Sequence, residues 1–236
     1  VCEQDVQHLF GAEGGTGGWS LLPWIWSNGG ALTNEDFTVA TGFINSEASV
    51  ATADMLKRWL DDGWMSPAIL GGGISTSEAL ANGQVAFIVD GPWMPPIFAA
   101  QFPDFELDMA VMPAGAGGSS SVVGGENIVL FEASENKDAA LAFMQFMLEE
   151  EQQIAMGKTG QMPVLQSLTG KAELPEHFPL FMEQLATAQP RTPSPQWQKI
   201  DEALGNAYQY ILRGEKDSQT ALDEAAGIVD CLLAGE

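Results

Sequence analysis

The apolar positions along the chain predict helices separated by short strands. The clearest helix begins after Asn45 or Ser46, either of which is a suitable cap, and Gly63 is a suitable left-handed terminator. Its apolar residues recur at helical spacing and form one stripe of Val50, Met55, Leu56, Trp59 and Leu60. Later apolar stretches predict further helices, namely those after Ser134 and after 149–151, and those at 178–187, 197–212 and 218–233.

Four short, β-prone apolar runs predict strands between these helices. They are Val6–Phe10, Gln84–Val89, Leu107–Met112 and Asn127–Phe131. Ser75 and Glu78 have the spacing of a capping box and predict a short helix that ends at Asn82 and Gly83. The Gly/Ser/Ala-rich stretch 114–121 predicts a flexible loop. Strands that alternate with longer helices indicate the α/β fold class.

The stretch GGWSLLPWIWSNGG, residues 17–30, places three tryptophans between two glycine pairs. Its apolar centre predicts a short helix, which the segment 28–30 stops. Trp24 and Trp26 are two residues apart, so on a helix they face different directions. We therefore expect Trp26 in the core, and we treat Trp19 and Trp24 as candidates for a binding surface.

Composition and charge exclude some classes of partner. The chain has 236 residues, 45% of them hydrophobic, which suits one large or two small globular domains. Nine basic and 32 acidic residues give a net charge of −23. A surface this negative repels nucleic acid and anionic lipid, so we expect neither as a partner. No apolar run approaches the ~20 residues of a membrane span.

The two cysteines, Cys2 and Cys231, lie near opposite ends of the chain, without metal-binding spacing to each other or to His8 and His177. We therefore expect no metal and no cofactor. Two alternatives stay open for the cysteines: a disulfide that ties the termini in an oxidising compartment, or two free thiols.

The run GQVAFIVDGPW, residues 83–93, resembles a segment of the extracellular solute-binding proteins of the maltose-binding type, which are the ligand receptors of ABC sugar importers. Six further segments resemble that family in the same order: NSEASVATADMLKRWLDDG, MAVMPAGAGG, VVGGENIVLF, SENKDAALAFMQFMLEEEQQ, TGQMPVL and LRGEKDSQTALDEAA. The resemblance covers nearly the whole chain. No single motif is specific, but seven in the right order indicate the family.

The resemblance implies a fold like the periplasmic-binding-protein type II fold, with a mixed sheet flanked by helices. Members of the family are longer, and the part without a counterpart lies before Val1 and contains most of an N-terminal lobe. We expect 1–121 and 169–236 to form the C-terminal lobe, and 122–168 to be a crossover segment that the family places in the N-terminal lobe. The chain is then a fragment, or this segment packs differently here. The family also implies a periplasmic or extracellular location, with membrane tethering of the full-length protein left open.

Aromatic candidates for the site follow from the resemblance. Sugar recognition uses flat aromatic faces against the C–H-rich side of a pyranose ring. Trp93 follows Gly91 and Pro92 directly after a predicted strand, and in the family the tryptophan of this turn lines the sugar-binding cleft. The resemblance implies the same role for Trp93, a stacking role for Trp19, and a role for Trp197 in completing the sugar subsite. The alternative for each of them is a place in the core.

Polar candidates lie at the ends of predicted elements. Gly124 and Gly125 allow the backbone to approach a ligand closely, and Glu126 and Asn127 are able to exchange hydrogen bonds with its hydroxyl groups. Comparable polar residues at element ends are Asn28 and Asp90. Each of these residues is also explained as a turn former or a helix cap.

We predict a non-catalytic receptor that binds a mono- or oligosaccharide in an interlobe cleft. Its partners are the sugar ligand, the N-terminal lobe and the membrane permease of an ABC importer. Three alternatives stay open. The same fold could bind a polyamine or another cationic solute, which acidic and aromatic side chains attract. Asp90 and Glu126 could be the carboxylate pair of a glycoside-acting enzyme. The chain could also be a protein-interaction lobe without a small-molecule ligand.

Overall fold

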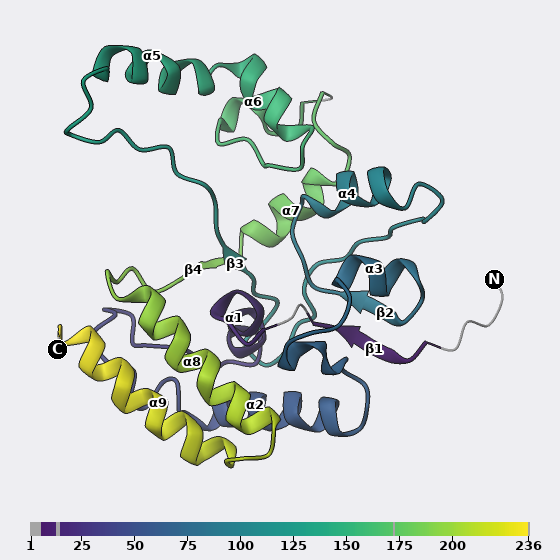
Figure 1. The fold of residues 1–236 in the computed structure, drawn as a ribbon, viewed down its shortest axis with the longest axis vertical. Helices are drawn as coiled ribbons and strands as arrows, with labels where there is room; N and C mark the ends of the chain where they lie inside the picture. The colour runs from purple at the N-terminus through teal and green to yellow at the C-terminus, as the bar shows by residue number, and fades with distance from the viewer. Residues whose placement is uncertain (1–5, 13–14, 172, 236) are drawn as a thin grey trace. The chain divides into compact units, whose positions relative to one another are not determined.

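The computed structural model describes residues 6–12, 15–171 and 173–235. The backbone divides into two compact units (Figure 1). Unit 1 consists of Val1–Val89, Val111–Val123 and Gln184–Glu236, and unit 2 consists of Asp90–Ala110 and Gly124–Glu183. The predicted crossover segment, 122–168, belongs to unit 2 from Gly124 onward.

Short parallel strand pairs and dominant helices form the architecture, which confirms the predicted α/β class. In unit 1, β1 (His8–Gly11) pairs in parallel with β2 (Val85–Ile88), with Phe10 opposite Phe87. The rings of these two phenylalanines stack at 5.3 Å between centroids. A second parallel pair joins β3 (Val122–Val123) to β4 (Gln189–Pro190).

The tryptophan-rich stretch forms α1 (Gly18–Ser27), a helix with eight buried residues out of ten. Its end is built by the Asn28-Gly29-Gly30 sequence, as predicted. The Asn28 side-chain amide donates to the Trp24 carbonyl at 2.8 Å, and Gly29 takes a positive φ of 86°. At Gly30 a Cβ would lie 2.6 Å from Ser49 Oγ, so the chain turns where a larger residue would not fit.

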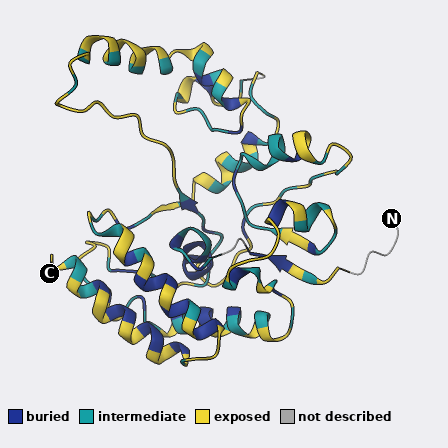
Figure 2. Ribbon diagram, in the orientation of Figure 1, coloured by how far each residue is buried: buried dark blue, intermediate teal, exposed yellow. Residues whose placement is uncertain are grey.

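Three long helices complete the core of unit 1. They are α2 (Glu47–Asp61), α8 (Trp197–Leu212) and α9 (Ser218–Leu233). Each presents a buried stripe to the others and an exposed face outward (Figure 2). The predicted cap of α2 is confirmed, because the Ser46 side chain accepts from the Ser49 N–H. The Asp217 side chain caps α9 in the same way.

Smaller elements of unit 1 also follow their local sequence. The 3-10 helix η1 (Pro67–Leu70) precedes α3 (Thr76–Ala81). Ser75 Oγ accepts from the Glu78 N–H at 3.2 Å, which confirms the predicted cap. Gly83 follows the helix with a φ of 69° and ends it.

Tyr208 carries an unsatisfied polar group in this core. The side chain is 0% exposed on α8, and among the described residues its hydroxyl has no hydrogen-bond partner. Burial raises the pKa of Tyr208, so the hydroxyl stays neutral. An unsatisfied buried hydroxyl costs about 1–3 kcal/mol.

We therefore expect Tyr208→Phe to raise the free energy of unfolding by about 1 kcal/mol. For a domain of this size that raises Tm by about 2–4 °C. Thermal unfolding followed by circular dichroism measures the change, and Tyr210→Phe, on the exposed face of α8, is the matched control. A lower Tm for Tyr208→Phe would show that the hydroxyl has a partner, such as a buried water molecule.

The regular elements of unit 2, among the residues that the structure describes, are helices. They are α4 (Met94–Gln101), α5 (Lys137–Met147), α6 (Glu150–Gly157), the 3-10 helix η2 (Gln166–Leu168) and α7 (Phe178–Leu185), which enters unit 1 at its last two residues. Phe98 is buried with its ring tilted against Phe102 and Phe105. Leu168 and Phe178 are also buried. The core of this unit is small.

Two predicted strands are wrong. Neither Leu107–Met112 nor Asn127–Phe131 is a strand in the structure, because neither run pairs with a neighbouring strand in the described part of the chain. The Met112 N–H donates to the Gln184 side chain at 2.6 Å instead. The predicted loop 114–121 is a loop, but it is anchored: Gly117 N–H donates to the Ser27 carbonyl at 2.8 Å.

Candidate functional site

Two of the predicted aromatic residues lie at the beginnings of helices in unit 1. Trp19 is the second residue of α1 and Trp197 the first of α8. Both are half-buried and pack against the hydrophobic core. A Cβ at Gly18 would lie 3.2 Å from the Trp197 ring. The structure therefore places Trp197 against the residue that precedes Trp19.

An acidic side chain that the sequence did not indicate joins these two helix ends. Asp201 Oδ1 accepts a hydrogen bond from the Gly18 N–H at 2.5 Å. A Cβ at Gly18 would lie 2.7 Å from the same oxygen. Glycine at this position lets the carboxylate reach the first turn of α1.

The contact continues along one face of α8. Thr16 donates its hydroxyl to the Gly205 carbonyl at 2.8 Å, and the Gln209 amide donates to the Thr16 hydroxyl at 3.0 Å. A Cβ at Gly205 would lie 2.4 Å from the Thr16 carbonyl oxygen. Residues four apart share a helix face. We call this face the α8 stripe, composed of Trp197, Asp201, Gly205 and Gln209.

Trp24 lies in the core of unit 1. It is 5% exposed, and its ring meets the edges or faces of Phe10 and Trp59, each at 5.3 Å between centroids. Trp26 is also buried, as predicted. Core packing alone accounts for Trp24 in this structure, and the contacts of its ring give no support to the expectation that it faces a ligand.

Asn28 has the contacts of a helix terminator. Its amide bonds to Trp24, and its Oδ1 lies 2.9 Å from where a Cβ of Gly115 would be. In the structure Asn28 therefore acts as a helix cap, which was the alternative explanation of this residue.

The predicted turn of unit 2 holds Trp93 firmly. Asp90 Oδ1 accepts from the Gly91 N–H at 2.8 Å. The Trp93 ring folds over Gly91, where a Cβ would lie 2.2 Å from ring carbon Cη2. Gly160, with a φ of 94°, comes so close from the other side that a Cβ would lie 2.5 Å from the Trp93 Cα. Half-buried Trp93 then begins α4 as its cap residue.

His177 also supports this turn. Its Nε2 lies 3.1 Å from the Pro92 carbonyl oxygen. Because a carbonyl oxygen only accepts, Nε2 carries the proton. The ring makes edge contacts with Phe178 and Phe181 at 5.0 and 5.8 Å between centroids. Removal from water lowers the pKa of His177, and the bond to Pro92 opposes this shift in part.

The lowered pKa predicts how the stability of unit 2 depends on pH. The neutral ring is favoured in the folded state, so its contribution is present above the unfolded pKa of about 6.5 and is lost as pH falls through the lowered folded value. We expect a lower urea midpoint at pH 5 than at pH 7.5, and a smaller difference in His177→Gln. His8→Gln, in unit 1, is the control. Equal pH dependence in wild type and His177→Gln would contradict the prediction.

The remaining predicted residues, Gly124, Gly125, Glu126 and Asn127, lie in an exposed segment of unit 2 that is neither helix nor strand. A Cβ at Gly125 would meet nothing within 4 Å. No packing contact with the described part of the chain therefore requires glycine at that position.

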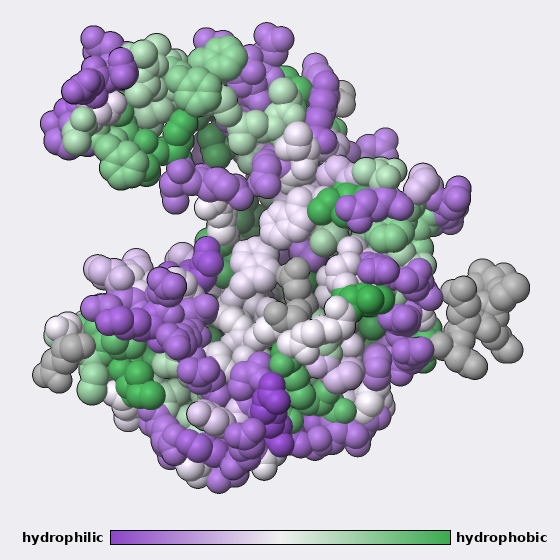
Figure 3. All heavy atoms as spheres, in the orientation of Figure 1, coloured by the Kyte–Doolittle hydropathy of each residue, from purple (hydrophilic) through white to green (hydrophobic). Residues whose placement is uncertain are grey.

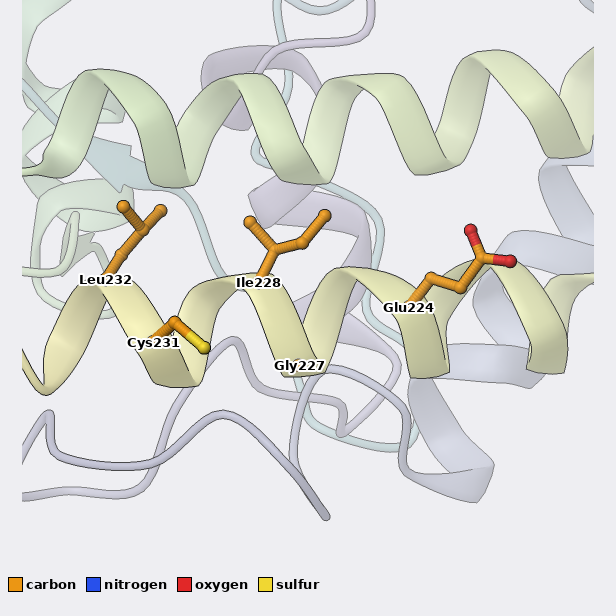
Figure 4. A pocket seen from close by; sticks show the side chains of 5 residues that line it. All are labelled: Glu224, Gly227, Ile228, Cys231 and Leu232. Carbon is orange, nitrogen blue, oxygen red and sulfur yellow. The ribbon is translucent and has the colours of Figure 1, made fainter. Parts of the chain in front are cut away.

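Other features of the described residues carry no site. None of the described His, Cys, Asp and Glu residues form a group of three or more that could hold a metal. None of the described helices is both long and apolar enough to cross a bilayer. A shallow depression on α9 is lined by Glu224, Gly227, Ile228, Cys231 and Leu232 (Figure 4). Cys231 is a free, exposed thiol, and Cys2 lies outside the described residues.

Comparison with known proteins gives a family match. The family model of the bacterial extracellular solute-binding proteins matches residues 6–178 of this chain. The maltooligosaccharide ABC transporter solute-binding lipoprotein of Streptococcus pneumoniae R6 is 25% identical over 199 residues, which cover 78% of this chain and 44% of that protein. The chain thus spans less than half the length of this curated relative.

Solved structures show the same fold. The GacH receptor of Streptomyces glaucescens, solved unliganded and with acarbose, superimposes with a TM-score of 0.86 at 24% identity, over 96% of this chain and 60% of that chain. The cyclic alpha-maltosyl-1,6-maltose binding protein of Arthrobacter globiformis superimposes with a TM-score of 0.78 at 26% identity, over 99% of this chain and 61% of that chain.

Proposed function

Because the chain belongs to the bacterial extracellular solute-binding protein family, we propose that it is part of a non-catalytic receptor for a carbohydrate. The observation that carries this proposal is the Trp93 turn, in which an aromatic face is held in place by Gly91, Gly160 and His177. A rigid indole face suits the C–H-rich side of a pyranose. The relatives that bind maltooligosaccharide or maltosyl sugars, by their names, support the same ligand class.

The other site residues are assigned by this proposal. Within unit 1 it assigns an aromatic surface to Trp19 and Trp197. Within unit 2 it assigns hydrogen-bonding groups to the Asp90 carboxylate and to Gly124, Gly125, Glu126 and Asn127. Trp24 and Asn28 support α1 from the core and from its end. The receptor captures its ligand outside the cell membrane, closes around it and delivers it to the permease of an ABC importer.

We also propose that a second lobe covers an apolar surface of unit 2. None of the residues of α5 is buried, and Figure 3 shows apolar side chains gathered over this helix. The 128–148 apolar surface consists of Ile128, Val129, Leu130, Phe131, Leu141, Phe143, Phe146 and Leu148. Exposed apolar patches of this kind mark interaction sites. The partner that we propose is an N-terminal lobe.

Phe131 tests this second proposal, because its side chain is 75% exposed. We expect Phe131→Asp to change the stability of the 236-residue chain by no more than about 0.5 kcal/mol. In a polypeptide that also contains the second lobe, the same substitution lowers Tm, because the charge is then buried. Differential scanning calorimetry measures both. An unchanged Tm in the longer polypeptide would contradict the proposal.

Ligand titration tests the carbohydrate proposal. We expect maltotriose to change tryptophan fluorescence saturably, at millimolar concentration if the second lobe is absent, while cellotriose and putrescine serve as comparison ligands. A response to putrescine with none to saccharides would replace the proposal by a cationic solute. Steady turnover of an aryl maltoside would replace it by an enzyme, and the Asp90→Asn and Glu126→Gln variants would then identify the carboxylates.

A further inference from the structure

The N-terminus of α1 lacks a cap of its own. Gly17 stands at the cap position without a side chain, and the first turn contains no acidic residue. The first N–H groups of a helix have no partner within the helix and carry a partial positive charge. Ser46 and Asp217 cap their own helices locally. At α1 the acceptor comes instead from Asp201, 183 residues further along the chain.

The glycine pair before Trp19 is the structural counterpart of this distant cap. A Cβ at Gly17 would lie 3.5 Å from Asp201 Oδ2, and one at Gly18 would lie 2.7 Å from Oδ1. A side chain at Gly18 would push the carboxylate away. The Gly17-Gly18 pair therefore gives Asp201 direct access to the backbone next to Trp19.

Asp201 also shares its helix face with Trp197, four residues earlier. The same carboxylate therefore links α8, one turn after Trp197, to the first turn of α1, which carries Trp19. Both of these aromatic side chains are assigned to the ligand by the proposed function. The Gly18–Asp201 bond thus connects the backbone next to Trp19 to the helix that begins with Trp197.

We propose that Asp201 is a positioning residue that sets the spacing of Trp19 and Trp197 for carbohydrate binding. This inference rests on the proposed function. Asp201 acts through the backbone of Gly18, and the aromatic faces contact the sugar. A charged acceptor at a helix N-terminus makes a stronger bond than a neutral one, so the spacing depends on the carboxylate as well as on the shape of the side chain.

The test separates positioning from simple helix capping. Asp201→Ala is expected to weaken maltotriose binding about tenfold. It is also expected to lower Tm, because the loss of a helix cap destabilises the folded protein. Asp201→Asn gives an intermediate effect. Adding Gly17→Ser to Asp201→Ala supplies a local cap, because Gly17 has the extended conformation of a cap residue, with φ −89° and ψ 167°. We expect this double variant to regain Tm but not affinity.

Glu202→Ala is the matched control. Glu202 is exposed on α8 next to Asp201, and this substitution removes one negative charge, as Asp201→Ala does. It is expected to change neither Tm nor affinity. The proposal is overturned if Asp201→Ala binds maltotriose as the wild type does, or if Gly17→Ser restores affinity together with Tm.

A second measurement distinguishes a failure of the proposed carbohydrate-binding function from a failure of the positioning role of Asp201. If the wild-type chain binds no saccharide, the carbohydrate proposal fails. The indole N–H resonances of Trp19 and Trp197 then decide whether Asp201 positions them. We expect Asp201→Ala to shift both resonances and to speed exchange of the Gly18 amide, with the indole shifts unchanged by Gly17→Ser. Unshifted indole resonances would overturn the positioning role.

Discussion

Replacing Trp24 by alanine is expected to lower the free energy of unfolding of unit 1 by about 3–5 kcal/mol. The side chain is buried between Phe10 and Trp59, so its loss removes apolar contacts from two neighbours and leaves a cavity. Urea unfolding followed by far-UV circular dichroism measures the change. Few single substitutions in this chain should cost more.

Trp64→Ala is the control, because Trp64 is 49% exposed and the substitution should cost no more than about 0.5 kcal/mol. Trp24→Phe keeps an aromatic ring in the core and should cost less than Trp24→Ala. If Trp24→Ala left stability unchanged but abolished saccharide binding, the ring would face the ligand, and its place in the core would be wrong.

Replacing Trp93 by alanine is expected to weaken maltotriose binding by about 30-fold or more, since a buried aromatic anchor contributes about 2 kcal/mol or more to binding. The loss of stability should be smaller, because Trp93 is half-buried and Asp90, Gly91 and Pro92 keep the turn. Isothermal titration calorimetry measures affinity, and circular dichroism checks the fold.

Trp93→Phe retains a flat face of smaller area and should lose less than about tenfold. Trp64→Ala again serves as the control, since it removes an indole elsewhere in the molecule. Binding that is unaffected by Trp93→Ala would remove the Trp93 turn from the site and with it the observation that carries the proposed function.

Local signals predicted the helices well. Ser46 and Ser75 are followed by helices that they cap, and Gly63 and Gly83 end helices in the left-handed conformation. Each of these features depends on residues within one or two turns, which the sequence displays side by side. The strands were harder, because a strand needs a partner. The run Asn127–Phe131 has the composition of a strand, but it pairs with nothing in the described part of the chain.

In the candidate site, too, local features were predictable from the sequence and long-range contacts were not. The turn at Trp93 was visible because the Gly-Pro-Trp sequence is local. Its support by His177, 85 residues away from Pro92, was not visible in the sequence. Neither was the hydrogen bond that the Gly18 N–H donates to Asp201. One signal was present: Trp197 and Asp201 are four residues apart, which places them on one helix face. Nothing in the sequence, however, indicated which backbone that face would meet.

The α8 stripe has a consequence for how the protein folds during synthesis. Thr16 and Gly18 bond to residues 183 to 193 positions later. Contacts of such sequence separation form slowly, because a long loop must close first. The backbone next to Trp19 therefore lacks its hydrogen bonds to α8 until residues 197–209 have been synthesised. Throughout that interval α1 packs against α2 through Trp24 and Trp59, but the face of α1 that α8 covers stays exposed and available to a chaperone.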